Sequence, residues 1–132
     1  RYAGFAAEDS AEPWTAVNGN HVRVNAADQL KDEDSIFHYY QKLIALRKEL
    51  EVIAYGDIEP LAEHDPSVFA YRRIYEGHEL VMVANFYGKE YTWKGAPELE
   101  GFRKVLGNYQ GEETTEGAAM VLKPYEAAVW YK

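Results

Sequence analysis

The chain has 132 residues, of which 47% are hydrophobic, so it is long and apolar enough to fold around one modest core. Its formal net charge of −8 and its lack of a basic stripe argue against nucleic acid or an anionic membrane surface as a partner, and no apolar run approaches the ~20 residues of a membrane span. The absence of cysteine excludes disulfides and thiolate metal sites, and it is compatible with a cytoplasmic protein.

Residues 1–31 are expected to form a long irregular loop, because glycine, alanine, asparagine and aspartate recur there without a sustained period. A loop of this length is unusual inside a small independent domain. It also carries Val22, Val24 and Leu30, which need a surface to pack on. We therefore interpret it as a surface loop of something larger, and Arg1 in place of an initial methionine suggests a processed or excised fragment.

Residues 32–50, DEDSIFHYYQKLIALRKEL, predict one amphipathic helix. Asp32 is the expected N-cap, because its carboxylate can accept hydrogen bonds from the free N–H groups of the first turn. The apolar stripe recurs at three- and four-residue spacing and comprises Ile36, Tyr40, Leu43 and Ile44. We interpret the neighbouring Tyr39 and Tyr40 as core residues with hydroxyl groups at the rim rather than as a ligand site.

After residue 51 the pattern becomes that of β-strands. Residues 68–75 and 80–85 are expected to pair as a hairpin, with a turn at Glu76-Gly77. The run LVMVAN at 80–85 is nearly all apolar, which is typical of a central strand buried on both faces, so Val81 and Val83 are predicted core residues. The other expected strand segments are residues 53–60, with a bend at Tyr55-Gly56-Asp57, then 89–93, 99–107 with one or two short strands, 117–122 and 127–131.

The last two of these strands are expected to form a closing hairpin around Lys123, Pro124 and Tyr125. Short strands at this spacing are typical of an antiparallel β-sandwich. The chain is therefore predicted to be mainly β, with an antiparallel sandwich that follows a long loop and one helix.

Side chains that could carry catalysis or bind a metal do not gather into a recognisable motif. The histidines are far apart and lack the spacing of zinc ligands: His21, His38, His64 and His78. The acidic clusters lack the spacing of a calcium loop and are interpreted as solvated loops or helix caps: Glu8–Asp9, Asp32–Asp34 and Glu112–Glu113. The serines lack the context of a nucleophile elbow: Ser10, Ser35 and Ser67.

The tryptophans offer a weaker possibility, the stacking of sugar rings. Trp130 lies within the last expected strand and is predicted to be a core residue. Trp93 ends a short strand and could be exposed, but a sugar platform there is the less favoured interpretation. Paired carboxylates could hydrolyse a glycosidic bond, but the sequence places no two of these acids at the required separation.

Several segments taken together resemble the α-amylase superfamily of glycoside hydrolases. They are Ala3-Gly4-Phe5, Glu12-Pro13-Trp14, Val17-Asn18 with Asn20 and Asn25, DSIFHYYQKLIALRKEL at 34–50, Tyr55-Gly56-Asp57, VFAYRR at 68–73, VANFYGKE at 83–90 and PYEAAVWYK at 124–132. Within the superfamily the chain is most similar to exo-acting α-glucosidases such as oligo-1,6-glucosidase, dextran glucosidase and trehalose-6-phosphate hydrolase. The resemblance covers nearly the whole chain and is specific in combination.

The resemblance implies a (β/α)₈ catalytic barrel followed by an antiparallel β-sandwich called domain C. Residues 1–50 would be the last loop and helix of that barrel, and residues 51–132 would be domain C. The family's catalytic aspartate nucleophile, glutamic acid/base and second aspartate lie on earlier barrel strands, outside this chain. We therefore assign no catalytic, substrate-binding or metal-binding residue here, and no cofactor.

The expected function is that of the non-catalytic C-terminal portion of a retaining α-glucosidase, which hydrolyses α-glucosidic bonds in gluco-oligosaccharides or trehalose 6-phosphate. The expected partners are the rest of the barrel, the sugar substrate of the parent enzyme and, through the exposed helix face, a second copy of the chain. The alternative is an independent carbohydrate-binding or structural β-sandwich module. The helix argues against that alternative, because a self-sufficient sandwich does not need it.

Overall fold

The computed structural model describes residues 2–7, 9–97, 99–111, 114–116 and 119–132. The chain divides into two compact units, Arg1–Ala45 and Leu46–Lys132, and the division falls inside one helix. No helix within these described ranges has the length and apolar character needed to cross a membrane.

The first unit consists mainly of turns, with η1 (Tyr2–Gly4), α1 (Ala26–Gln29) and most of α2 (Ile36–Glu49). The expected loop over residues 1–31 therefore contains two short helical turns. Asn25 caps α1, since its Oδ1 accepts a hydrogen bond from the Asp28 N–H at 2.9 Å. Gly4 (φ 83°) allows η1 to approach α1, because a Cβ there would lie 2.5 Å from the Ala27 nitrogen.

Helix α2 begins three residues later than an Asp32 cap would place it. The Ser35 Oγ accepts a hydrogen bond from the His38 N–H at 3.3 Å, so Ser35 is the N-cap, and the prediction of Asp32 was wrong. The Asp32 carboxylate instead accepts the Asp34 N–H at 3.0 Å and closes a turn ahead of the helix.

A short helix, α3 (Glu51–Tyr55), follows α2 where a strand over 53–60 was predicted. Leu50 adopts an extended conformation between the two helices. Leu50 and Val52 are buried against the outer face of the sheet, and this packing overrides the β propensity of Val52 and Ile53. The strand is confined to β1 (Asp57–Pro60).

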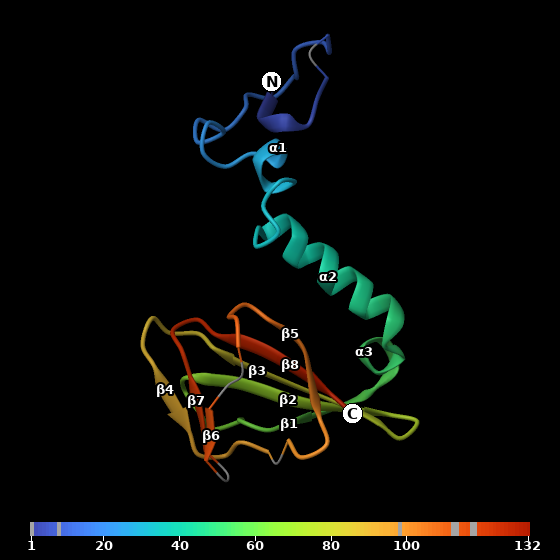
Figure 1. Cartoon of the computed structure of the whole chain (residues 1–132), viewed down its shortest axis with the longest axis vertical. Coiled ribbons are helices and arrows are strands. Elements are labelled where there is room, and N and C mark those ends of the chain that lie inside the picture. Colours follow the sequence, from blue (N-terminus) through green and yellow to red (C-terminus); the bar gives the residue numbers. More distant parts are fainter. Residues whose placement is uncertain (1, 8, 98, 112–113, 117–118) are drawn as a thin grey trace. The chain divides into compact units, whose positions relative to one another are not determined.

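The second unit is an antiparallel β-sandwich, as predicted. One sheet has the order β1–β2–β3–β8–β5, and its further strands are β2 (Val68–Tyr75), β3 (His78–Asn85), β8 (Ala127–Tyr131) and β5 (Arg103–Gly107). The other sheet has the order β4–β7–β6, with β4 (Tyr91–Trp93), β7 (Ala119–Leu122) and β6 (Thr114–Glu116). Figure 1 shows β4, β7 and β6 crossing beside the larger sheet.

The predicted hairpin and central strand are confirmed. Strands β2 and β3 pair from Val68↔Asn85 to Tyr75↔His78, around a two-residue turn in which Glu76 and Gly77 both have positive φ. Strand β3 is the middle strand of its sheet, and Val81 and Val83 are fully buried. The unbroken apolar run reflects burial on both faces, between two separate clusters of core residues.

The predicted closing hairpin is wrong, because β7 and β8 belong to different sheets. Strand β7 pairs with β4 and β6, whereas β8 lies between β3 and β5. Alternating apolar and polar residues show which face of a strand is buried, but they do not show which other strand is its neighbour. Of the predicted strand 117–122, residues 117 and 118 lie outside the described residues, and β6 was not predicted.

Two clusters of apolar side chains form the core of the sandwich. The cluster between the sheets joins Val81, Val83 and Trp130 of the larger sheet to Met120 and Leu122 of the smaller one. The second cluster lies on the outer face of the larger sheet, where the end of α2 and α3 cover it. Its members include Leu46, Leu50, Val52, Leu80, Met82 and Val129.

Candidate functional site

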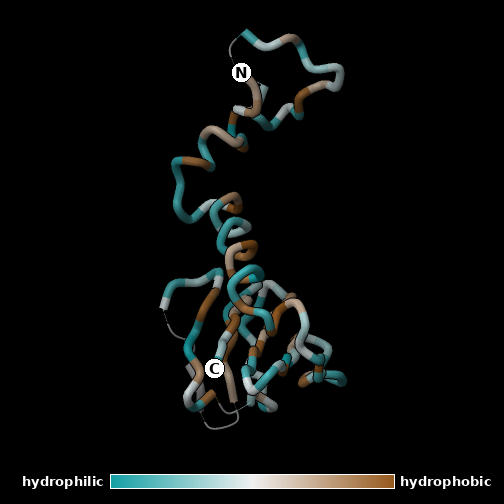
Figure 2. Tube along the Cα trace, turned by 90° about the vertical axis from the view of Figure 1, so that its right-hand side faces the viewer, coloured by the Kyte–Doolittle hydropathy of each residue, from teal (hydrophilic) through white to brown (hydrophobic). Residues whose placement is uncertain are grey.

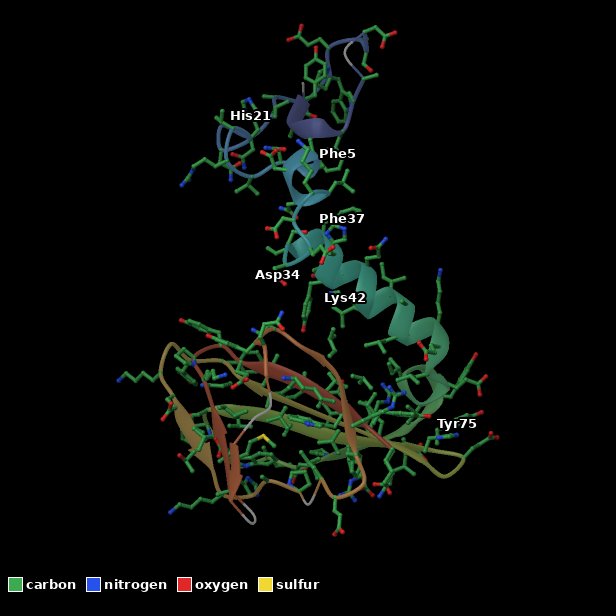
Figure 3. All side chains as sticks on the ribbon, in the orientation of Figure 1. Phe5, His21, Asp34, Phe37, Lys42 and Tyr75 are labelled. Atoms are coloured by element: carbon green, nitrogen blue, oxygen red, sulfur yellow. The ribbon has the colours of Figure 1, made fainter. Side chains whose placement is uncertain are left out.

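An apolar groove of about 590 Å³ lies on the first unit. Helix α2 supplies Ile36, Tyr40 and Ile44, spaced four residues apart and therefore on one face of the helix. Phe5 comes from the N-terminal segment and Phe37 from the first turn of α2, and both are labelled in Figure 3. The remaining lining residues are Ala3, Val24, Asn25, Ala26, Gln29 and Gln41.

The apolar side chains of this groove are exposed to solvent. The exposed fraction is 85% for Phe5, 68% for Ile36 and 61% for Tyr40. Phe37 and Ile44 are exposed as well, and Figure 2 shows the apolar (brown) residues recurring along α2. Burial of each such side chain would contribute about 1.5–3 kcal/mol, so a contiguous set of this kind marks an interface.

The polar groups of the groove serve its own backbone. Gln29 Oε1 accepts the Phe37 N–H at 3.0 Å, and Asn25 caps α1. The described lining residues include no carboxylate and no imidazole that could transfer a proton. The arrangement is therefore suited to packing against another apolar surface rather than to chemistry.

The expectation that Tyr39 and Tyr40 are core residues with rim hydroxyls fits only one of them. Tyr39 is half-buried, and this burial raises the pKa of its phenol above the ordinary value. Tyr40 is exposed and lines the groove. The helical spacing correctly placed Tyr40 on the apolar face, but no described part of the chain covers that face.

His21, His38 and His78 take part in hydrogen bonds within the chain. His21 Nδ1 lies 2.9 Å from the Asn18 carbonyl oxygen, and His78 Nδ1 lies 2.8 Å from the Tyr131 hydroxyl. His64 lines a cleft near the β1–β2 connection. Among the residues that the structure describes, no group of three or more histidine, aspartate or glutamate side chains could hold a metal ion.

Ser35 and His38 form a serine–histidine contact that the sequence reasoning missed. The Ser35 Oγ lies 3.2 Å from His38 Nδ1, but it also donates to the Gln29 carbonyl at 2.7 Å and caps α2. The same His38 nitrogen lies 2.7 Å from the Asp32 carbonyl oxygen. Both side chains therefore hold the start of the helix, and the hydroxyl is not aimed at a substrate.

Asp65, in the connection between β1 and β2, also has a structural role. The Asp65 carboxylate accepts the Ser67 and Val68 N–H groups, and its second oxygen accepts the Tyr91 hydroxyl at 3.0 Å. This hydrogen bond raises the pKa of Tyr91, because it stabilises the protonated phenol. Glu8 and the Glu112–Glu113 cluster lie outside the described residues.

The tryptophans resolve the question of a sugar platform at Trp93. Trp93 is only 3% exposed and Trp130 only 6%, and both belong to the core between the sheets. The idea of an exposed platform at Trp93 is therefore wrong, and the prediction of Trp130 as core is confirmed. Trp14 in the first unit is exposed.

Comparison with known proteins divides the chain into two matching segments. Residues 1–56 match the model of the α-amylase catalytic domain, and residues 68–129 match the model of the α-amylase SusG C-terminal domain. An oligo-1,6-glucosidase from Halalkalibacterium halodurans is 39% identical over 98% of the chain, and a trehalose-6-phosphate hydrolase from Escherichia coli K12 is 34% identical over 97%.

The chain spans less than a quarter of these relatives. It covers 23% of the Halalkalibacterium halodurans protein and 22% of the Escherichia coli protein, and it aligns with the C-terminal part of such enzymes. The crystal structure of Bacillus licheniformis trehalose-6-phosphate hydrolase superposes on 92% of the chain with a TM-score of 0.79 and 33% identity, using 22% of that protein.

Proposed function

Because the chain belongs to the α-amylase family and carries the end of its catalytic domain together with its C-terminal domain, we propose that it is the non-catalytic C-terminal portion of an α-glucosidase. The parent enzyme hydrolyses α-glucosidic bonds in gluco-oligosaccharides or in trehalose 6-phosphate. Its catalytic carboxylates belong to the rest of the barrel. We place the parent enzyme in the cytoplasm, consistent with a chain without cysteine.

Residues 1–50 supply the last loop and helix of the (β/α)₈ barrel, and residues 51–132 form the C-terminal β-sandwich. The two family matches, which end at residue 56 and begin at residue 68, support this division. The apolar groove carries the argument, because Ile36, Tyr40 and Ile44 are exposed where the rest of a barrel would cover them. The outer cluster of the sandwich, around Leu50 and Val52, anchors the end of the helix.

A chimera tests this proposal. The oligo-1,6-glucosidase of Halalkalibacterium halodurans is truncated before its matching portion and fused to this chain. We expect the chimera to hydrolyse isomaltose, and the truncated enzyme and the isolated chain to be inactive. Tyr40→Asp should abolish the activity of the chimera because it places a charge in the barrel interface, whereas Lys42→Asp, on the same helix but outside the groove, should retain it.

Two outcomes would contradict the proposal. Turnover of an aryl α-glucoside by the isolated chain that persists through repurification would show that catalytic residues lie within it. Full activity of the Tyr40→Asp chimera would show that the groove does not contact the barrel.

The independent carbohydrate-binding or structural module remains the alternative function. That alternative predicts that the sandwich alone binds carbohydrate or serves the structural role, and that the first unit is dispensable. In the isolated chain we propose that a second copy occupies the same groove, since the exposed apolar set favours self-association. Sedimentation at increasing concentration tests this: the parent chain should associate and Tyr40→Asp should stay monomeric.

A further inference from the structure

The connection between β7 and β8 presents an exposed tyrosine in a backbone conformation that tyrosine rarely adopts. Tyr125 has a φ of 54°, and its exposed fraction is 64%. A positive φ is unfavourable for a residue with a Cβ and persists only where the surroundings impose it. Because the ring is exposed, burial in the core does not explain why a tyrosine stands there.

Two loops hold the backbone and the ring of Tyr125. Its N–H donates to the Tyr87 carbonyl at 3.0 Å, and its carbonyl accepts from Asn108 Nδ2 at 2.7 Å. A Cβ built on Gly88 would lie 3.1 Å from the Tyr125 hydroxyl oxygen and 3.3 Å from a ring carbon. The ring therefore rests on the bare backbone of Gly88, and solvent reaches the rest of it.

Two buried polar side chains fix the loops beneath this ring. Asn85 is 2% exposed and donates to the carbonyls of Lys89 at 2.8 Å and Lys123 at 2.9 Å. Glu126, also 2% exposed, accepts the Lys123 N–H at 2.7 Å. Such satisfied buried networks are rigid, so the exposed ring is held in place before any ligand arrives.

The side chains in the loops near Tyr125 include both aromatic and charged residues. A hollow of about 350 Å³ shares Gly88 with the support of the Tyr125 ring and is also lined by Asn85, Tyr87, Lys89 and Glu90, among others. Lys123 Nζ lies 5.0 Å from the centre of the Tyr109 ring, on the other side of the turn. Charges of both signs interrupt the apolar surface, which suits neither a continuous protein interface nor an anionic ligand.

We propose that the Tyr125 ring, supported by Gly88, is a surface site that stacks a pyranose ring of an α-linked gluco-oligosaccharide. The C–H face of the sugar packs on the aromatic ring, while its hydroxyls bond to the lysine and glutamate side chains beside the hollow. The ring platform rests on this geometry alone, whereas the choice of α-linked glucose rests on the proposed function.

Titration of the ¹⁵N-labelled chain with isomaltotriose tests the site. We expect saturable amide shifts around Gly88, Asn108 and Tyr125, with a Kd on the order of 1 mM. Tyr125→Asn and Gly88→Ala should weaken binding about fivefold or more, while Tyr125→Phe should retain it. Asparagine tolerates the left-handed backbone, so the first variant removes the ring without disturbing the turn.

Tyr55→Asn is the matched control, because Tyr55 is 67% exposed but lies on α3. It should bind isomaltotriose like the parent chain, and an equal loss of affinity would overturn the site. No saturable shift at up to ~50 mM saccharide would also overturn it. Shifts with cellotriose and not with isomaltotriose would overturn the α-linked assignment. None of these results depends on the chimera, which tests the barrel contact.

Discussion

The two units of the chain differ in what they bury. In the sandwich, Val81, Val83, Met120 and Leu122 are fully buried between two sheets. Among the described residues of Arg1–Ala45, the only buried one is Ser35, a polar helix cap. A region gains stability mainly by removing apolar surface from water. We therefore expect the sandwich to be stable by its own packing and the first unit to need a partner that covers its groove.

The largest effect is expected from a charge at the centre of the sandwich. Val83 is fully buried, because it lies in the middle strand of the larger sheet and in the core between the sheets. Val83→Asp loses about 1.5–3 kcal/mol of burial and adds the several kcal/mol cost of an unpaired buried carboxylate. Because a domain of this size has only ~5–15 kcal/mol of stability, we expect the variant to be unfolded or nearly so in a thermal melt.

Glu63→Lys, at an exposed site of the same unit, is the control and should change stability by less than about 0.5 kcal/mol. If Val83→Asp melted like the unmodified chain, burial of Val83 between the sheets would not be what stabilises the sandwich.

A smaller effect is expected from the polar network below Tyr125. Asn85→Leu leaves the Lys89 and Lys123 carbonyls and the Tyr87 N–H without their partner. We expect a loss of about 2–4 kcal/mol in urea unfolding, because several backbone groups stay desolvated. Asn108→Leu also removes hydrogen bonds, but at an exposed position where water can replace them, and should cost less. Equal losses would mean that burial of Asn85 is unimportant.

Ser35→Ala sharpens the comparison within the first unit. Loss of the N-cap should cost about 1 kcal/mol of local helix stability. Hydrogen exchange should then quicken in the first turns of α2, while exchange in β3 keeps its parent rate, because β3 belongs to the other unit. Faster exchange throughout β3 would indicate that the two units unfold together.

The smallest effect is expected from the groove itself. Tyr40→Asp removes an exposed ring from a helix face that nothing in the described chain covers. The melting of the sandwich should therefore stay within about 0.5 kcal/mol of the parent chain. A clear drop would mean that Tyr40 packs within this chain, and it would weaken the assignment of the groove to a missing barrel.

Patterning predicted those parts of the fold whose signal is local. The apolar run at 80–85 predicted the central strand, and Glu76–Gly77 predicted the turn. The pattern did not predict α3. Its sequence is also compatible with a strand, and the packing of Val52 on the sheet favours the helix. The partners of β7 and β8 were also mispredicted, because alternation specifies faces and not neighbours.

The sequence predicted only some of the residues that line the groove. Helical spacing predicted the stripe of Ile36, Tyr40 and Ile44. Phe5 comes from a segment 31 residues before Ile36 (36 − 5), and it carries no periodic signal. The Tyr125 site depends on a positive φ and on the bare backbone of Gly88, which belong to different loops. A glycine–tyrosine pair of this kind becomes recognisable only when the loops are in place.

The order of strands in the larger sheet has a consequence for biosynthesis. Strand β8 is the last of the described strands to be translated, yet it lies between β3 and β5 near the middle of the sheet. Until β8 has been made, β3 has one unpaired backbone edge, and β5, whose only neighbour in this sheet is β8, has no strand partner. The larger sheet is therefore complete only after residues 127–131 have been made, and until then its unpaired strand edges are open to pairing with other chains.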